Sequence, residues 1–228
     1  MPFLLIDKPA GITSHDVVDK VRKITGERTV GHAGTLDPFA TGLLIVGVGR
    51  DCTKQLSTYL GMDKEYEATF VIGATTETLD PETPVVVAPR VDTWIDPYGE
   101  VRSAMKKLTG EISQIPPMHS AIKIGGQKMY NLARQGKIVE IPPRKITIHS
   151  FELLPRDSTG GSETLPCAWP ITLKVRINCS SGTYIRALAR DLGLLLGTTG
   201  YVSSLRRTKI GEYSVASAKT LETLSHPF

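Results

Sequence analysis

The segment VGHAGTLDPFATGLLIVGVG, residues Val30 to Gly49, joins a polar loop with two glycines to an uninterrupted apolar run. The apolar run from Gly42 to Gly49 is typical of a short buried strand. The loop before it holds His32 and Asp37, and Pro38 disfavours helical geometry at the aspartate. Polar groups on a loop braced by rigid elements are a common way to build a site. We therefore expect a functional loop here, although the same pattern fits an aspartate that caps a turn.

Strands and helices alternate around this segment without a regular repeat. Residues 65–73 and 170–179 alternate between apolar and polar positions, as half-buried strands do. Residues 13–25 have helical spacing, with Thr13 and Asp16 resembling a capping box. These patterns predict an α+β fold with a central mixed, mostly antiparallel sheet flanked by helices. We also expect strands at 146–154 and within 205–213, helices at 53–60, 97–109, 128–135, 183–196 and 214–224, and loops at 31–38 and 75–84.

Length and charge give a first view of organisation. The 228 residues fit one domain with a sizeable insertion. The net charge is only +4, but residues 1–114 hold 12 basic and 16 acidic residues, whereas residues 115–228 hold 15 and 7. Residues 115–150 alone hold six Lys and Arg against one Glu. The second half is therefore the part expected to meet a polyanion.

Other patterns exclude several classes of protein. The opening MPFLLIDKPAG lacks the basic start of a secretory signal, and no apolar stretch is long enough to cross a bilayer. The three cysteines are widely spaced, and the five histidines form no metal-binding pair. We therefore expect a cytoplasmic protein that holds no metal and does not associate with membranes.

Residues Val30 to Gly49 closely resemble the signature of the TruB family of tRNA pseudouridine synthases. The resemblance continues at matching intervals through nearly the whole chain. It is carried by DKPAGITSHDVV (Asp7–Val18), KEYEA (Lys64–Ala68), PPMHSAIKIGGQKMYNLARQG (Pro116–Gly136), CSSGTYIRALARDLG (Cys179–Gly193) and LRRTKIGEY (Leu205–Tyr213).

The resemblance implies an isomerase that converts uridine to pseudouridine at position 55, in the TΨC loop of tRNA. The uracil is detached from C1′ of the ribose, turned and rejoined through carbon 5, so no cofactor or metal is implied. The family's pseudouridine-synthase fold implies a single catalytic domain over residues 1–228, with an RNA-gripping insertion at about 112–142. The C-terminal PUA domain that TruB enzymes usually carry is expected to be absent. We expect a monomer that binds the TΨC arm and requires no protein partner.

Four residues match the family's catalytic positions. Asp37 matches the catalytic aspartate, which either attacks the ribose as a nucleophile or assists removal of a proton from it; the sequence leaves both roles open. Arg186 matches an arginine that pairs with that aspartate, and a nearby cation favours the ionised carboxylate. Tyr66 matches the tyrosine that stacks on the target base, and Tyr184 matches a second active-site tyrosine.

Further residues match positions that bind the substrate or support the site. His32 matches a histidine that holds the flipped nucleotide, and Leu205 matches an apolar residue of the pocket. Lys8 and Pro9 match a pair that supports the catalytic region. The basic side chains expected to contact phosphates are Lys123, Lys128 and Arg134 in the insertion, and Arg206, grouped with Arg207 and Lys209, near the pocket.

Two other functions compete with this interpretation. A guide-RNA-dependent synthase of the dyskerin type shares a similar GH-x-GTLDP stretch, but such proteins normally keep the PUA domain. A non-catalytic module that binds or folds tRNA is the other alternative. The presence of Asp37, Tyr66 and Arg186 together argues against a module that only binds.

Overall fold

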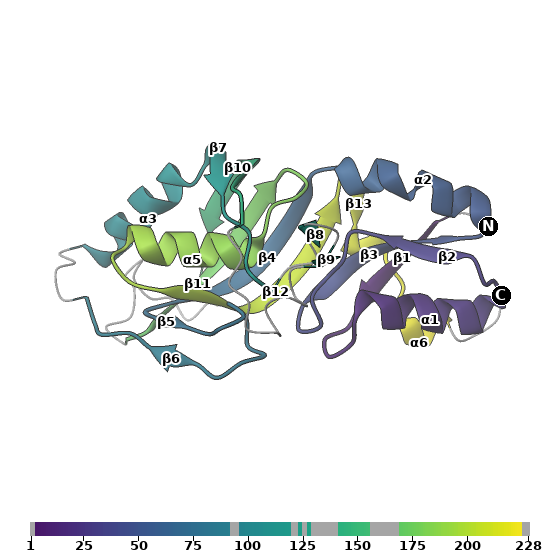
Figure 1. Cartoon of the computed structure of the whole chain (residues 1–228), viewed down its shortest axis with the longest axis horizontal. Helices are drawn as coiled ribbons and strands as arrows, with labels where there is room; N and C mark the ends of the chain where they lie inside the picture. The colour runs from purple at the N-terminus through teal and green to yellow at the C-terminus, as the bar shows by residue number, and fades with distance from the viewer. Residues whose placement is uncertain are drawn as a thin grey trace. The chain divides into compact units, whose positions relative to one another are not determined.

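The computed structural model describes residues 3–91, 96–119, 123–124, 127–128, 141–155 and 169–224 (Figure 1). The strands of the main sheet are hydrogen bonded in the order β1-β3-β12-β4-β11-β10-β7, with β2 beside β3 and β13 beside β12. Strand β3 runs antiparallel to β1 and β2 but parallel to β12. The predicted α+β class with a mixed sheet is therefore confirmed.

The chain divides into two compact units, each made of separate stretches of sequence. The first holds Met1–Ala68, Arg176–Ser181 and Ser204–Phe228, and the second holds Thr69–Val175 and Gly182–Ser203. Strands β4 (Lys64–Ile72), β11 (Ile171–Cys179) and β12 (Gly200–Ile210) each pass from one unit into the other. The two units are described separately below.

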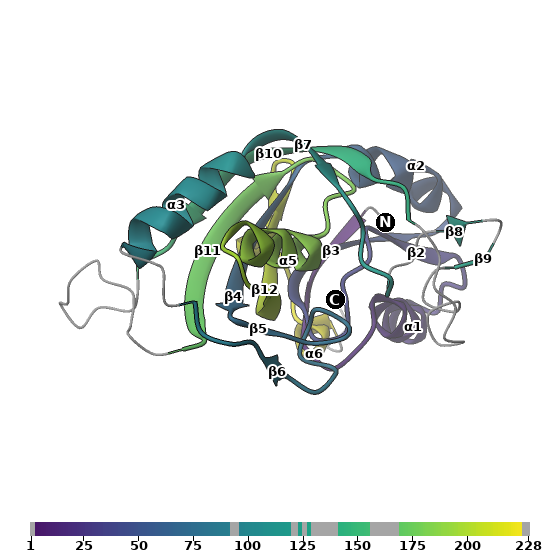
Figure 2. The ribbon, with the colours of Figure 1, turned by 60° about the vertical axis from the view of Figure 1, so that its left-hand side comes forward.

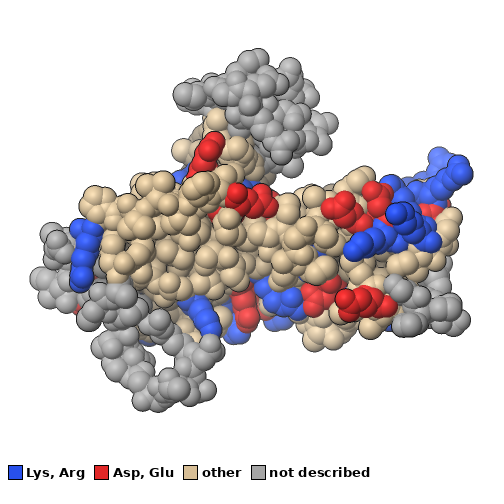
Figure 3. Space-filling model, turned by 90° about the horizontal axis from the view of Figure 1, so that it is seen from below, with Lys and Arg blue, Asp and Glu red and all other residues tan. Residues whose placement is uncertain are grey.

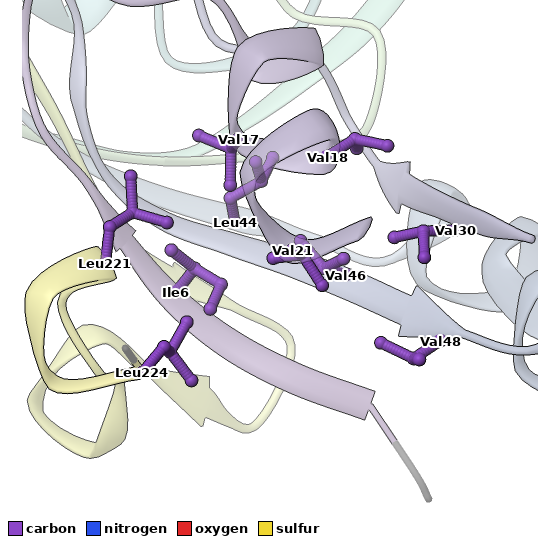
Figure 4. Packing of buried hydrophobic residues seen from close by; sticks show 10 residues of the cluster. All are labelled: Ile6, Val17, Val18, Val21, Val30, Leu44, Val46, Val48, Leu221 and Leu224. Atoms are coloured by element: carbon purple, nitrogen blue, oxygen red, sulfur yellow. The ribbon is translucent and has the colours of Figure 1, made fainter. Parts of the chain in front are cut away.

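The first unit packs helices on both faces of its strands. Val17, Val18 and Val21 of the first helix form a buried cluster with Ile6 and Leu44 (Figure 4). On the other face, Leu56 packs with Leu43 and Ile45. The remaining elements of this unit are β1 (Phe3–Lys8), α1 (Ser14–Thr25), β2 (Val30–Ala33), β3 (Thr41–Val48), α2 (Arg50–Gly61), β13 (Tyr213–Ser214), a 3₁₀ turn (Val215–Ser217) and α6 (Leu221–Leu224).

Helix α1 begins and ends where the sequence predicts. The Thr13 hydroxyl accepts from the Asp16 backbone amide, and the Asp16 carboxylate accepts in return from the Thr13 amide, forming the predicted capping box. Gly26 ends the helix in the left-handed conformation, with φ 70°. Five residues separate the start of helix α1 from the end of β1, and Ser14 is buried in the first turn of the helix.

The second unit carries a strand pair and two long helices. Ile146 of β10 pairs with Ile112 of β7, while helix α3 packs against β10 and α5, as can be followed in Figure 2. Val101, Met105 and Leu108 are buried in the phase that the sequence predicts. The remaining elements of this unit are β5 (Ala74–Thr75), β6 (Val86–Val87), α3 (Pro97–Lys107), β7 (Gly110–Gln114), β8 (Lys123–Ile124), β9 (Gln127–Lys128), β10 (Arg144–Leu153) and α5 (Ile185–Leu195).

Three predicted elements differ in the structure. His32 lies in strand β2, opposite Val46, and not in the loop that its glycine neighbours indicate. The helix expected at 214–224 is broken, because Lys219 is drawn into backbone hydrogen bonds with Leu5 and Asp7 of β1. Strand β12 begins at Gly200, five residues before the predicted strand. Most of the helix expected at 128–135 lies outside the described residues.

Candidate active site

The loop that carries Asp37 connects β2 to β3 in the first unit. The sequence predicts a loop before β3 but not the strand β2 that precedes it. It leaves β2 at Gly34, whose φ of 80° is a left-handed conformation that glycine adopts without strain. The Asp37 carbonyl then accepts a 3.1 Å hydrogen bond from the Ala40 amide, which turns the chain into β3. The Asp37 side chain is half-buried at this turn.

Lys8 and Ser14 hold the loop on both sides of Asp37. The buried Lys8 ammonium donates to the carbonyls of Pro38 at 3.2 Å and Ile12 at 2.7 Å. The Ser14 hydroxyl donates to the Leu36 carbonyl at 3.1 Å and accepts from the Leu36 amide at 2.8 Å. The backbone next to Asp37 is thus fixed from β1 and from α1. The sequence assigned this supporting role to Lys8 but did not reveal Ser14.

Burial weakens the charge of Lys8. Desolvation lowers its pKa from 10.5 to about 8, although the negative charges of Asp37 and Asp16 act in the opposite direction. The Lys8 ammonium binds the carbonyl of Pro38, the residue that follows Asp37. Lys8 is therefore charged at neutral pH and contributes positive potential to the Asp37 loop.

Tyr66 lies on the buried face of β4, as the alternation of that strand predicts. Its ring is 8% exposed, and burial raises the pKa of its hydroxyl. The charge of Arg207 and a hydrogen bond from its guanidinium lower that pKa in part, while the charge of Asp37 raises it. Asp37, Tyr66 and Arg207 therefore lie close enough to influence one another within the first unit.

His32 is half-buried on β2 and is kept neutral. Burial lowers its pKa, and the positive charge of Arg207 lowers it further. Its Nδ1 atom is buried and finds no hydrogen-bond partner among the residues that the structure describes. A neutral imidazole with one unused nitrogen can still accept or donate a hydrogen bond.

Leu205 and Arg206 are neighbours on β12 with different surroundings. Leu205 is buried, whereas Arg206 makes a two-fold contact with the Asp7 carboxylate at 2.6 and 3.0 Å. Arg206 also lines a pocket of about 560 Å³ with Lys20 and Lys23 of α1. Figure 3 shows Lys and Arg side chains gathered with acidic ones around the helices of this unit.

Arg186 sits in the first turn of α5 in the second unit, and its guanidinium is held on three sides. It donates to the Asp80 carboxylate at 2.8 Å, to the Thr78 carbonyl at 2.8 Å and to the His119 carbonyl at 2.9 Å. The side chains of this ion pair are 6% and 3% exposed. The resemblance did not indicate Asp80, which lies in the segment predicted as a polar loop.

One sequence signal points to Asp80. Thr78-Leu79-Asp80-Pro81 repeats the tetrapeptide that surrounds Asp37, Thr35-Leu36-Asp37-Pro38. In the second copy, the Thr78 hydroxyl and the Glu82 amide donate to the Asp80 carboxylate beside Arg186.

Tyr184 precedes α5 and is fixed through its backbone. The buried amide of Gln114 donates to the Tyr184 carbonyl at 3.2 Å and accepts from the Tyr184 amide at 2.9 Å. Gln114 ends β7, and Arg190 of α5 donates to the carbonyl of the next residue, Ile115, at 2.7 Å. Sequence periodicity contains no signal for this contact, which joins residues 70 positions apart.

The insertion is described only in part. Lys123 and Lys128 pair across the short hairpin of β8 and β9, while Arg134 lies outside the described residues. Among the described residues, no group of three or more His, Cys, Asp or Glu side chains is placed to hold a metal ion. In the same part of the chain, no helix combines the length and apolar character needed to span a membrane.

Comparisons with known proteins cover almost all of the sequence. A family model described as the N-terminal domain of TruB family pseudouridylate synthase matches residues 22–185, and one described as the C-terminal domain of tRNA pseudouridylate synthase B matches residues 186–227. The tRNA pseudouridine synthase B of Thermobifida fusca is 46% identical over 227 residues, which are 99% of this chain and 74% of the relative. That of Mycobacterium tuberculosis (strain H37Rv) is 47% identical, over 98% of this chain and 71% of the relative.

Solved structures show the same fold. The Cbf5 complex with Nop10 and Gar1 contains a chain that is 27% identical, with a TM-score of 0.67 over 96% of this chain. The archaeal box H/ACA complex of Nop10 and Cbf5 gives 26% identity and a TM-score of 0.65 over 98% of this chain. This chain spans about half the length of those two, 52% in each case.

Proposed function

This chain belongs to the TruB family of pseudouridylate synthases, and on that premise we propose that it isomerises uridine to pseudouridine at position 55 of tRNA. The relatives named tRNA pseudouridine synthase B are 46–47% identical, whereas the Cbf5 chains of the RNA-containing particles are 26–27% identical. This difference favours a synthase that acts on tRNA without a guide RNA. A single chain suffices for this activity, and its compartment is the cytoplasm.

The observation that carries the proposal is the set of groups around Asp37. The loop presents a carboxylate whose backbone is fixed by Lys8 and Ser14, within electrostatic reach of Tyr66. The reaction breaks the bond between N1 and C1′, forms one between C5 and C1′, and moves the C5 proton to solvent while N1 gains one. Asp37 serves at C1′, either as nucleophile or as the base that assists proton removal from the ribose.

Other residues of the first unit bind the target nucleotide in this proposal. Tyr66 offers an aromatic face on which a flipped base stacks, and Leu205 adds an apolar contact. The neutral His32, with its unused Nδ1, forms a hydrogen bond that holds the nucleotide out of the RNA stack. Arg206 contacts a phosphate beside the site.

The second unit contributes the remaining groups of the proposed machinery. Arg186 acts as the cation that stabilises the reacting carboxylate, and Tyr184 lines the pocket near the base. The insertion at about 112–142 grips the TΨC arm through Lys123, Lys128 and Arg134. Residues 1–228 form one catalytic domain in this proposal.

The deciding experiment incubates the purified chain with an unmodified tRNA transcript, without guide RNA, and maps pseudouridine along the product. We expect modification at the TΨC uridine alone. Asp37→Asn should lower the single-turnover rate by roughly 10²- to 10⁴-fold or more, while the Kd for tRNA stays within about twofold. Asp51→Asn is the matched control, because Asp51 is an exposed acid on α2 of the same unit.

Three results would contradict the proposal in different ways. Absence of product with the unmodified chain would favour a binding module or a requirement for a guide RNA. Equal losses of rate and binding in Asp37→Asn would make Asp37 a structural residue. Product at other uridines would change the substrate assigned to the chain.

A second experiment tests the insertion. The double variant Lys123→Gln with Lys128→Gln should weaken tRNA binding and reduce the slope of log Kd against log salt by about 1 to 2, because two phosphate contacts are lost. Lys54→Gln with Lys107→Gln is the control, since both lysines are exposed and lie outside residues 115–150. An unchanged slope would remove Lys123 and Lys128 from the interface.

A further inference from the structure

Arg207 is a fully buried cation to which the proposed reaction assigns no role. It lies on β12 and is 1% exposed. The sequence groups it with Arg206 and Lys209 in a basic cluster near the pocket, where contact with phosphates is expected. Its Nε donates to the Leu43 carbonyl at 2.8 Å, and its Nη2 donates to the Gly34 carbonyl at 2.9 Å. Both acceptors flank the Asp37 loop, so Arg207 is bound to the backbone at the two ends of that loop.

Two glycines make this approach possible. A Cβ added at Gly34, where φ is 80°, would lie 3.4 Å from an Arg207 terminal nitrogen. A Cβ added at Gly42, where φ is 104°, would lie 2.2 Å from the Arg207 carbonyl oxygen, which no side chain can tolerate. Gly42 also pairs with Arg207 in the parallel register of β3 and β12. The loop therefore closes around Arg207 at both ends.

Arg207 lies beside the strand that carries the proposed base-stacking residue. Strand β12 is hydrogen bonded next to β4, and Thr208, which follows Arg207, donates to the carbonyl of Glu65, which precedes Tyr66, at 3.2 Å. The charge of Arg207 acts on the Tyr66 hydroxyl, and also on His32 and Lys8. One buried cation therefore acts on side chains from three different strands.

We propose that Arg207 is a positioning residue that sets the placement of the Asp37 loop relative to the Tyr66 ring. A guanidinium is planar and carries five donors in a fixed fork, so it can bind the carbonyls at both ends of the loop at once. A lysine has the same charge but lacks this geometry. The inference rests on the proposed function, because it concerns residues to which that function assigns catalysis and base stacking.

The test compares Arg207→Lys, which keeps the charge, with Arg207→Met, which removes it. Displacement of the loop by about 1 Å should lower the single-turnover rate by about 100-fold in both variants, with the Kd for tRNA within about twofold of the original. Lys54→Met is the control, because Lys54 lies on α2 of the same unit, its side chain is 65% exposed, and it belongs to neither proposed basic cluster. We expect this variant to react at the original rate.

A spectroscopic readout separates positioning from general structural damage. The ultraviolet pH titration of the chain, minus that of Tyr66→Phe, reports ionisation of Tyr66. This ionisation should move to higher pH in Arg207→Met, because the cation that lowers the Tyr66 pKa is gone, and much less in Arg207→Lys. Urea unfolding identifies any variant that fails to fold, in which case Arg207→Lys alone carries the test.

The outcomes distinguish this inference from the proposed function. An Arg207→Lys variant with the original rate would overturn the inference. A weaker Kd with a reduced salt slope would make Arg207 an RNA contact and would also overturn it. If the original chain makes no pseudouridine, the proposed function fails, yet the Tyr66 titration still decides whether Arg207 holds that ring.

Discussion

The tetrapeptide Thr-Leu-Asp-Pro occurs once in each unit, and the two copies have different surroundings. Around Asp37, the buried cations Lys8 and Arg207 donate to main-chain carbonyls, and the aspartate stays half-buried. Around Asp80, the buried cation Arg186 donates to the carboxylate itself, which is 2% exposed. The comparison teaches that the same tetrapeptide can be fixed through its main-chain carbonyls in one unit and through an ion pair with its carboxylate in the other.

The largest expected effect comes from breaking the buried ion pair. Asp80→Asn leaves the Arg186 charge without its counter-ion, which should lower the free energy of unfolding by roughly 3–5 kcal/mol. Urea denaturation measures this loss. Glu67→Gln is the control: its ion pair with Arg176 is 42% and 40% exposed, so we expect a loss below about 1 kcal/mol. Equal losses of unfolding free energy in the two variants would mean that burial of the ion pair between Asp80 and Arg186 does not affect stability.

The next effect tests the cation beside the first copy. Lys8→Met leaves the carbonyls of Pro9, Ile12 and Pro38 without their donor, which should lower the free energy of unfolding by roughly 1–3 kcal/mol. The turnover rate should fall as well, because Pro38 follows Asp37. Lys64→Met is a matched control, since Lys64 is also buried but donates to Leu60 and Met62. A larger rate loss in Lys64→Met would contradict the role assigned to Lys8.

A smaller effect on the free energy of unfolding is expected at Ser14. Its uncharged hydroxyl forms hydrogen bonds with the backbone of Leu36, in the tetrapeptide that contains Asp37. Ser14→Ala removes two hydrogen bonds to Leu36 and should cost about 1 kcal/mol of unfolding free energy. The Leu36 amide should lose protection from hydrogen exchange, measured by NMR. Ser203→Ala, which removes a 3.3 Å bond to the Thr69 carbonyl in the second unit, should leave Leu36 unchanged.

The last prediction concerns the pH dependence of stability around the first copy. The pKa of Lys8 is about 8 in the folded chain but 10.5 in the unfolded chain, so the unfolded state binds more protons between these values. The contribution of Lys8 to stability should therefore rise as pH increases from about 8 towards 10.5. Urea unfolding of the original chain and of Lys8→Met at several pH values checks this. A difference that shrinks with pH would contradict it.

Local patterns predicted the parts of the fold that depend on local interactions. The capping box at Thr13, the alternation through Tyr66 and the helical phase around Leu188 all follow from the chemistry of neighbouring residues, and each is confirmed. Strand β1 and the break at Lys219 were not predicted. Strand β1 depends on its pairing with β3, in which Phe3 lies opposite Gly47, and the break depends on hydrogen bonds between Lys219 and residues more than 200 positions away. A local pattern contains no information on either.

The candidate site, like the fold, could be predicted only in part from the sequence. Motif resemblance indicated Asp37, Tyr66 and Arg186, and the structure places Asp37 and Tyr66 in the first unit and Arg186 in the second. The partners Ser14, Gln114 and Asp80 were missed, because each acts through contacts across 22 to 106 positions of sequence. Arg207 was interpreted as a surface cation, since a short motif does not reveal which residues of a strand are buried.

The division of the chain has a consequence for how this site can be inherited. The first unit is assembled from three separate stretches of sequence, and Asp37 belongs to it, whereas Arg186 belongs to the second unit. Any single cut within these residues divides the first unit, because its stretches lie on both sides of the second. A recombination event with one crossover therefore combines parts of the first unit from two parents, so the residues of that unit are expected to evolve together.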